Sequence, residues 1–399
     1  MAALTRRGVL RGLGTMACSA AAHPLMTTVT FASAPSWEAR LVVLILRGGM
    51  DGLDVVRPVG DPGFAAVRPG AGDGVPLDGF FAMHPGLRGL MPLWQAGELG
   101  FVHAVSTPYR DKRSHFDGQD LLEAGTAMDA RIARDGWLNR MLQTVPGVEG
   151  ETAFAIGQDP MKILSGAAEV ANWSPATRFD LSPQAQLLLE QIYRDDPLFR
   201  EAVTEAVALA DTISTDLAED APDADMMAAM RDRGGRSETA LAAFAADRLN
   251  RDTRIAAFSI NGWDTHRDQA GPMDRRLSQL AEVLLTLKSG LGINWSRTTV
   301  LAMTEFGRTV RLNGSRGTDH GTGGAMLVAG GAVRGGRVMG HWPGLAEADL
   351  YDRRDLMPTG DVRAYAAWAM RGAFGLGRGD LESKVFPGLD MGEDPGLIL

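Results

Sequence analysis

The stretch LVVLILRGGMDG, residues 41–52, decides which fold class this chain is expected to adopt. Its first six residues are an unbroken apolar run, partly β-branched, and glycines follow almost at once. Such runs are typical of strands that are buried on both faces of a parallel sheet. The same pattern recurs five times, so the sequence predicts six buried strands, at 41–46, 99–105, 152–156, 254–260, 298–303 and 325–329.

Helical patterns lie between these strands. Residues 277–287 place apolar side chains at i, i+3, i+4 and i+7, and much of 362–374 does the same. Strands that alternate with helices predict an α/β fold, with a mostly parallel central sheet sandwiched between helices. Residues 182–250, rich in Ala, Leu, Asp and Arg, are expected to form a helical insertion within one domain spanning 35–399.

The N-terminus has the layout of an export signal. Arg6 and Arg7 are adjacent, a long uncharged stretch follows, and the small residues Ala32-Ser33-Ala34 end it. This pattern indicates a twin-arginine signal over residues 1–34, so we expect a periplasmic or secreted protein. The stretch is too weakly apolar for a stable membrane span.

Charge and cysteine content argue against several classes of function. The formal net charge is −9, and it becomes −12 without the first 34 residues, which hold three Arg and no acidic residue. An acidic surface argues against nucleic acid and anionic membranes as partners. Cys18, the single cysteine, lies in the signal, where a lipid anchor is a minor alternative. Cleavage would therefore leave a chain without disulfides, thiolate zinc sites or iron–sulfur clusters.

Three predicted strands lead directly to a carboxylate: Asp51, Asp264 and Glu305. Open α/β sheets bind ligands at the carboxyl ends of their strands, so we expect these side chains to share a site. In GWDTH, Asp264 and His266 are two residues apart, and an extended chain places both on the same side.

Two further polar clusters carry histidines. RSHFDGQD (113–120) contains His115, and GTDHGTGG (317–324) contains Asp319 and His320. Carboxylates and imidazoles together suit a divalent metal, either Zn, Mn, Mg or Ca. Two such ions about 4 Å apart would activate a nucleophile and stabilise a leaving oxygen in ester hydrolysis. Arg113 and Arg308 would then clamp an anionic group such as phosphate or sulfate.

Most of these candidates also have a purely structural interpretation. Ser114 begins a predicted helix with Asp117 three residues on, which is the pattern of a capping box. Asp51 stands among glycines and could shape a turn. Glu305 and Arg308 could form an i,i+3 surface ion pair. His320 could bond the backbone of its loop, and the isolated histidines are expected to be structural: His84, His103 and His341.

Four motifs in order resemble one family. LRGGMDGLDVVRP (46–58), RSHFDGQDLLEAG (113–125), GWDTH (262–266) and TEFGRTVRLNGSRGTDHGTGGAMLVAGGAVRGG (304–336) stand behind the twin-arginine signal. This arrangement is similar to the uncharacterised family called domain of unknown function 1501, which is grouped with the alkaline phosphatase and sulfatase superfamily. The resemblance extends from about Leu41 to the end of the chain.

The resemblance implies an alkaline phosphatase-like fold with a metal site at the strand ends. Asp51 matches the first-strand metal ligand, and Ser114 stands where the superfamily has its nucleophile. Asp264 with His266 resembles the Asp-plus-His ligand pair, although the superfamily usually spaces them wider. Glu305 occupies the place of a ligand at a strand end. Asp319-His320 resembles the late histidine ligand.

The sequence departs from the superfamily pattern at Phe306, which stands where a ligand histidine is expected. One metal ligand is lost there unless His115 or His320 replaces it. Two functions therefore remain open. The first is an exported metal-dependent hydrolase of small phosphate or sulfate esters, with Arg113, Ser114, His115 and Arg308 as catalytic candidates. The alternative is a non-catalytic periplasmic binding or assembly factor with a protein partner. A cofactor oxidoreductase is poorly supported, because no G-x-G-x-x-G follows the first strand.

Overall fold

The computed structural model of the chain describes residues 37–72, 74–127, 135–145, 148–157, 159, 161–173 and 238–399. The predicted signal segment 1–34 lies outside these residues. So does the predicted insertion 182–250, apart from residues 238–250. No helix in the described ranges is long and apolar enough to cross a membrane.

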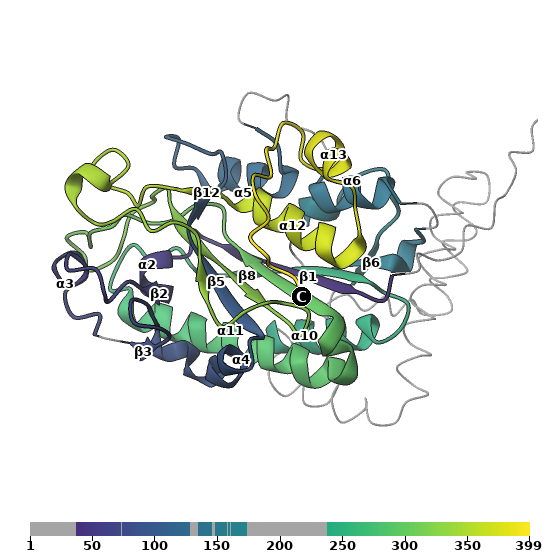
Figure 1. Cartoon of the computed structure of the whole chain (residues 1–399), viewed down its shortest axis with the longest axis horizontal. Coiled ribbons are helices and arrows are strands. Elements are labelled where there is room, and N and C mark those ends of the chain that lie inside the picture. Colours follow the sequence, from purple (N-terminus) through teal and green to yellow (C-terminus); the bar gives the residue numbers. More distant parts are fainter. Residues whose placement is uncertain are drawn as a thin grey trace, which may run out of the picture.

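A single nine-stranded sheet forms the centre of the molecule (Figure 1). Eight strands follow one another across it in the order β11 (Val338–Met339), β5 (Leu99–Ser106), β10 (Gly324–Ala329), β9 (Thr298–Met303), β1 (Arg40–Arg47), β8 (Ile255–Asn261), β6 (Ala153–Ile156) and β7 (Ala171–Trp173). The ninth strand, β12 (Gly360–Asp361), pairs with β5. All six predicted strands are present, with ends shifted by one residue at most.

The sheet is mostly parallel, as predicted. Only β10 runs against its neighbours, pairing antiparallel with β5 and β9. β1 is central, with Leu41 paired to Ile255 of β8 on one side and to Thr299 of β9 on the other. A separate small sheet has the order β2 (Val56–Arg57), β4 (Ala82–Met83) and β3 (Val75–Pro76).

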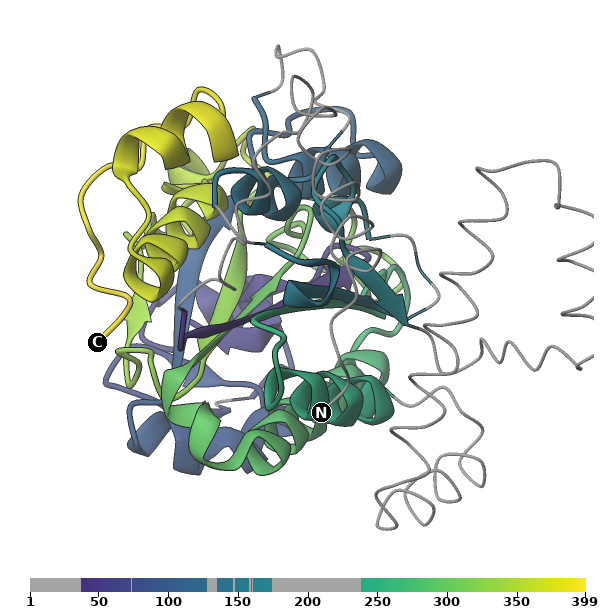
Figure 2. The ribbon, with the colours of Figure 1, turned by 90° about the vertical axis from the view of Figure 1, so that its right-hand side faces the viewer.

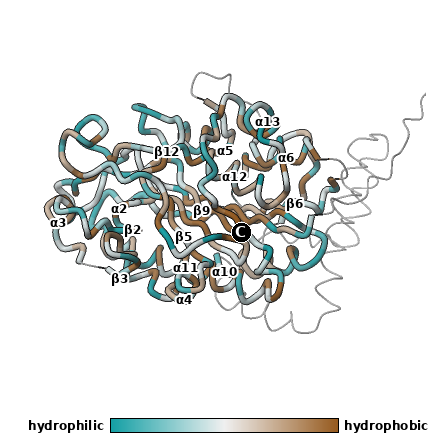
Figure 3. The backbone as a smooth tube through the Cα atoms, in the orientation of Figure 1, coloured by the Kyte–Doolittle hydropathy of each residue, from teal (hydrophilic) through white to brown (hydrophobic). Residues whose placement is uncertain are grey.

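The apolar run of β1 is buried on both faces because helices cover both sides of the sheet (Figure 2). Alternate residues of β1 divide between two cores, and Figure 3 shows the hydrophobic colour concentrated in these central strands. One core holds Val42 and Leu44, and helices on that side are α4 (Met91–Gln95), α10 (Glu238–Leu249) and α11 (Ala270–Leu291). The other core holds Val43, and its helices are α5 (His115–Ala124), α6 (Trp137–Gln143) and α12 (Val362–Phe374).

Helix α11 shows why the 3.6-residue pattern identified the helices. Leu277, Leu280, Leu284 and Leu287 fall on one face and are all buried against the sheet. Each contributes about 1.5–3 kcal/mol of apolar burial relative to exposure. The helix runs longer than the predicted 277–287 because further apolar residues continue the same face at both ends. The predicted helix 362–374 coincides with α12.

Short elements complete the described chain. They are α2 (Gly52–Val55), α3 (Phe64–Val67), α13 (Arg378–Asp380), the π-helical turn Leu381–Val385, and the 3₁₀ turns Pro85–Leu90, Gly150–Thr152, Lys162–Leu164, Gly292–Arg297 and Glu347–Asp349. One glycine after β1 is required by close packing: Gly48 has φ +123°, and a Cβ there would lie 2.6 Å from the Asp264 nitrogen. The loop after β1 can therefore touch the loop after β8.

Candidate metal site

Loops from five strands meet at one edge of the sheet. β1, β8 and β9 are parallel, so their carboxyl ends coincide there and bring Asp264 and Glu305 to the same edge. β10 is antiparallel, so its amino end lies at this edge and is preceded by His320. β5 is antiparallel to β10, so its carboxyl end also points there and leads to His115, the first residue of α5. The topology thus assembles residues that are 56 to 190 positions apart in sequence, as for Asp264 with His320 and His115 with Glu305.

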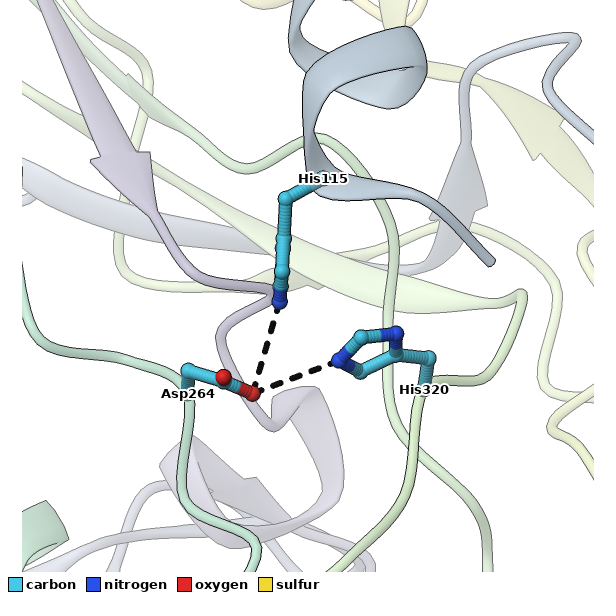
Figure 4. A group of neighbouring side chains, drawn as sticks. All are labelled: His115, Asp264 and His320. Carbon is cyan, nitrogen blue, oxygen red and sulfur yellow. Dashed lines mark hydrogen bonds and ion pairs between the residues drawn. The ribbon is translucent and has the colours of Figure 1, made fainter. Parts of the chain in front are cut away.

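The Asp264 carboxylate is the centre of this assembly (Figure 4). Its Oδ1 atom lies 3.4 Å from His115 Nε2, 3.3 Å from His320 Nε2 and 3.0 Å from His266 Nε2. The expected side-by-side placement of Asp264 and His266 is therefore present. Three of the seven histidines converge on one carboxylate oxygen through the same ring atom.

Each of the three imidazoles has its other nitrogen fixed by an oxygen acceptor. Because a carbonyl or ionised carboxylate only accepts, the Nδ1 atom must carry the proton in each ring. When a ring is neutral, its Nε2 atom presents a lone pair toward Asp264, and when the ring is charged, Nε2 donates to that carboxylate. The three Nδ1 contacts are His115 to Glu305 Oε1 at 2.8 Å, His266 to Asp319 Oδ1 at 3.2 Å, and His320 to the Arg113 carbonyl at 2.7 Å.

With the rings neutral, this arrangement gathers three imidazole lone pairs around the Asp264 carboxylate. His266 Nε2 and His320 Nε2 are 3.0 Å apart, and both face the Asp264 carboxylate. His115 Nε2 is buried and makes no hydrogen bond. Lone pairs and a negative charge at such separations repel one another unless a metal ion or ring protons lie between them. The donor set therefore fits a bound cation.

The spacing of the donors also fits a divalent metal. Ligand atoms about 2.0–2.1 Å from a tetrahedral zinc ion are about 3.3–3.4 Å apart. The distances from Asp264 Oδ1 to His115 Nε2 and His320 Nε2, 3.4 and 3.3 Å, have this length. In the described part of the chain, these three residues form the one group of at least three His, Cys, Asp or Glu ligands with mutual distances below 4.8 Å. Nitrogen donors favour zinc over magnesium or calcium.

Arg308 fixes Asp264 from behind. Its side chain is fully buried, and its guanidinium donates to Asp264 Oδ1 at 2.7 Å. Its other hydrogen bonds go to the carbonyls of Gly49, Trp263 and Thr318. Burial acts to raise the pKa of Asp264, but the Arg308 guanidinium outweighs it and holds this pKa below its usual value. Arg308 is thus placed to orient Asp264, and its burial leaves no open face for the predicted anion clamp.

Glu305 lies behind His115 rather than at the centre. The carboxylate is fully buried and also accepts hydrogen bonds from Gln119 Nε2 and the Gly48 nitrogen. Burial acts to raise the pKa of Glu305, but these hydrogen bonds, led by the one from His115, lower it overall. The same contact raises the pKa of His115. The alternative interpretation of Glu305 and Arg308 as a surface ion pair is wrong, because both side chains are buried and pair with other residues.

Phe306, the departure from the superfamily pattern, serves as a platform for the histidines. The His115 ring stacks on it with centroids 5.0 Å apart, and the His320 ring lies 5.1 Å away. Tyr109 stacks on it as well. His115 therefore brings an imidazole nitrogen to the site at which the sequence lacks the expected histidine.

Asp51 belongs to a separate buried network. Its carboxylate forms an ion pair with Arg68, accepts from Gln269 Nε2 at 2.7 Å and caps α2 through the Leu53 nitrogen. Burial acts to raise the pKa of Asp51, but Arg68 and Gln269 lower it overall. The structural interpretation of Asp51 as a turn-shaping residue is confirmed. Its oxygens are directed to these partners and not to the histidine cluster.

Ser114 and Arg113 precede His115 at the start of α5. Ser114 is the N-cap and accepts from the Asp117 nitrogen at 3.3 Å, so its capping role is confirmed. Arg113 has φ +53°, an uncommon conformation for a non-glycine residue. Arg113 is exposed. Arg113 thus remains a candidate for the predicted binding of an anionic group.

Asp319 takes an outer position, behind His266. Asp319, half exposed, accepts from Asn313 Nδ2 at 3.1 Å and from His266, and these bonds lower its pKa, with the Asn313 bond contributing most. His320 lies in the central cluster, and burial lowers its pKa.

The isolated His103 and His84 are structural, as expected: His103 donates to the Val56 carbonyl from within β5, and His84 caps the turn 85–90.

Sequence reasoning missed the residues that hold the carboxylates Glu305 and Asp51. Gln119 could have been found, because it follows His115 by four residues and so lies on the same helix face. Arg68 and Gln269 carried no such signal, since their partner Asp51 is distant in sequence and only the folded sheet brings them together.

The chain is thus an α/β protein with a histidine–carboxylate cluster at the carboxyl edge of its central sheet. The family model described as "Protein of unknown function (DUF1501)" matches residues 103–368, more than half of the chain, and the chain therefore belongs to that family. The family predicted from the sequence is confirmed. No curated protein sequence matches the chain.

Two solved structures are similar in fold. One is the C-terminal periplasmic domain of EcEptC from Escherichia coli in complex with Zn, with 10 % identity, a TM-score of 0.38 and 75 % of each chain covered. The other is a protein in the alkaline phosphatase superfamily from Vibrio parahaemolyticus, with 11 % identity, a TM-score of 0.33, and coverage of 78 % of this chain and 66 % of that one. At these TM-scores the likeness concerns the general course of the chain and carries no argument about the site.

Proposed function

We propose that the protein is an exported metal-dependent hydrolase of small phosphate or sulfate esters. The observation that carries the proposal is the convergence of His115 and His320, through their Nε2 atoms, on Asp264 Oδ1. Three protein ligands leave a fourth position for substrate, which is the pattern of catalytic zinc sites. A divalent cation held there supplies Lewis acidity toward an ester oxygen.

The protein's own residues supply the other parts of such a site. The exposed guanidinium of Arg113 is suited to bind an anionic ester group, because guanidinium donors match phosphate and sulfate oxygens. Ser114, whose hydroxyl accepts from the Asp117 nitrogen, directly precedes the ligand candidate His115 and is the candidate nucleophile. A bound divalent cation would lower the pKa of this hydroxyl, so that its proton could pass to water. The amino end of α5, which begins here, favours negative charge.

His266 is the candidate for a further ligand or a proton carrier. Its Nε2 is 3.0 Å from both Asp264 Oδ1 and His320 Nε2, and its side chain is 44 % exposed. An exposed imidazole at this position can exchange a proton with solvent while it remains beside the ester. Asp319 accepts a hydrogen bond from His266 Nδ1, which directs the Nε2 atom of His266 toward Asp264.

The test combines metal analysis with turnover. The protein purified without chelator is expected to contain zinc or another divalent metal, and the His320→Ala variant is expected to lose it. Hydrolysis of p-nitrophenyl phosphate or p-nitrophenyl sulfate should fall in Asp264→Ala and His320→Ala by more than the 10–100-fold that loss of an outer-shell partner costs. His341→Ala, which changes an exposed loop histidine, is the control.

Two results would count against the proposal. Unchanged rates in both ligand variants would remove the catalytic role. A protein without metal and without turnover would mean that a proton, not a metal, occupies the histidine cluster, and would favour the binding or assembly factor. A stoichiometric periplasmic partner would then be sought.

A further inference from the structure

Glu305 differs from every other carboxylate of the site in its burial and in the number of its donors. Its Oε1 accepts from His115 Nδ1 at 2.8 Å, Gln119 Nε2 at 3.0 Å and the Gly48 nitrogen at 2.9 Å, and its Oε2 accepts from the Thr304 hydroxyl at 3.0 Å. The side chain is 0 % exposed. An oxygen that already accepts three hydrogen bonds has no lone pair left for a metal.

Gln119 is itself held in one orientation by a second buried pair. Its Oε1 accepts from Arg47 Nη1 at 2.9 Å, and Arg47 pairs with the buried Glu123 at 2.8 Å. Because Arg47 only donates, the amide oxygen of Gln119 must face it, and the amide nitrogen must face Glu305. The chain Glu123–Arg47–Gln119–Glu305 therefore fixes the Glu305 carboxylate in its position against His115.

We propose that Glu305 is a positioning residue that acts on the metal site through His115. The carboxylate accepts a hydrogen bond from His115 Nδ1, and the ring is thereby held with its Nε2 lone pair directed at Asp264 Oδ1, 3.4 Å away. Carboxylates behind metal-bound histidines set the tautomer and the ring orientation and raise the basicity of the ligand nitrogen. This inference rests on the proposed metal site and reassigns Glu305, which the sequence placed among the ligands.

Asp319 provides a matched comparison within the same site. It accepts from His266 Nδ1 at 3.2 Å, but its side chain is 50 % exposed. Water can replace an exposed acceptor and cannot reach the buried one. Neutralising Glu305 should therefore weaken metal binding more than neutralising Asp319 does.

The experiment measures the dissociation constant for Zn²⁺ by competition with a chelator in wild type, Glu305→Gln and Asp319→Asn. Glu305→Gln keeps the shape of the side chain and removes its charge, and it is expected to weaken zinc binding about 10–100-fold. Asp319→Asn is expected to have a smaller effect. Unchanged zinc affinity in Glu305→Gln would overturn the inference.

The visible spectrum of the Co²⁺-loaded proteins separates positioning from ligation. At saturating Co²⁺, Glu305→Gln should give the wild-type spectrum, because the ligand atoms are the same. A changed spectrum would make Glu305 a ligand and contradict the proposal. If wild type binds neither ion, the proposed metal site fails first, and the inference falls with it.

A measurement on the wild-type protein covers the case in which Glu305→Gln does not fold. Long-range ¹H–¹⁵N spectra of histidine-labelled protein report the tautomer of each ring, and the His115→Gln variant assigns the His115 signals. His115 should be protonated at Nδ1, and added Zn²⁺ should shift its Nε2. An Nε2-protonated ring, or no shift at Nε2, would overturn the inference.

Discussion

Arg308 and Asp264 form an ion pair in which a fully buried cation fixes a half-exposed carboxylate. The side chain of Arg308 is 0 % exposed and that of Asp264 is 45 % exposed, with Nη2 and Oδ1 at 2.7 Å. The exposed side of Asp264 faces the histidines while its position is determined from the interior. The strand-end loops after β8 and β9 are thereby joined.

Replacing Arg308 should cost stability. Arg308→Met leaves the carbonyls of Gly49, Trp263 and Thr318 without this donor, and each unsatisfied buried acceptor costs about 1–3 kcal/mol. Urea unfolding of the metal-free protein should show a loss of at least about 3 kcal/mol, one such cost for each carbonyl. The control is Arg316→Met, because Arg316 is 80 % exposed and pairs with Asp268 at the surface. That change should cost no more than about 1 kcal/mol, and an equal loss in both variants would contradict the prediction.

Asp51 offers a test of which carboxylates bind metal. Asp51→Asn removes one partner of a buried ion pair and leaves Arg68 uncompensated, so we expect a loss of about 3–5 kcal/mol in the free energy of unfolding. The amount of bound metal should stay as in wild type, since the Asp51 oxygens are directed to Arg68 and Gln269. Loss of metal in a folded Asp51→Asn protein would restore Asp51 as a ligand.

These cases show what the sequence could reveal. The buried strands and the amphipathic helices were predictable because their patterns are local, as for β1 and α11. Which residues belong to the site was also largely predictable, because Asp264 and Glu305 follow strands and the histidines stand in polar motifs. Their individual roles were not. Whether a carboxylate faces the centre or supports a histidine depends on contacts such as Glu305 with His115, 190 residues apart.

His103 should make stability depend on pH independently of the site. Burial lowers the pKa of His103 to about 4 from 6.5. Between pH 6.5 and about pH 4, His103 is protonated in the unfolded chain and neutral in the folded protein. The folded state therefore loses stability as pH falls through this window. The full loss is about 3 kcal/mol. Unfolding free energies at pH 7 and pH 4.5 should therefore differ less in His103→Gln than in wild type.

The control for His103 is His341→Gln, because His341 lies exposed on a loop. This variant should keep the wild-type dependence on pH. An identical dependence in wild type and His103→Gln would mean that other buried groups dominate in this window.

Zinc should stabilise the folded protein in a way that depends on the proposed ligands. A ligand that binds only the folded state at 100 times its dissociation constant adds about 2.7 kcal/mol to the free energy of unfolding. We expect this gain with Zn²⁺ in wild type and in His84→Gln, whose histidine caps a turn away from the cluster. His320→Ala should show no gain at the same zinc concentration, because it removes one of three converging donors. Mg²⁺ should stabilise none of them, since imidazole nitrogens are poor ligands for it. Stabilisation of His320→Ala equal to that of wild type would place the bound zinc elsewhere on the protein.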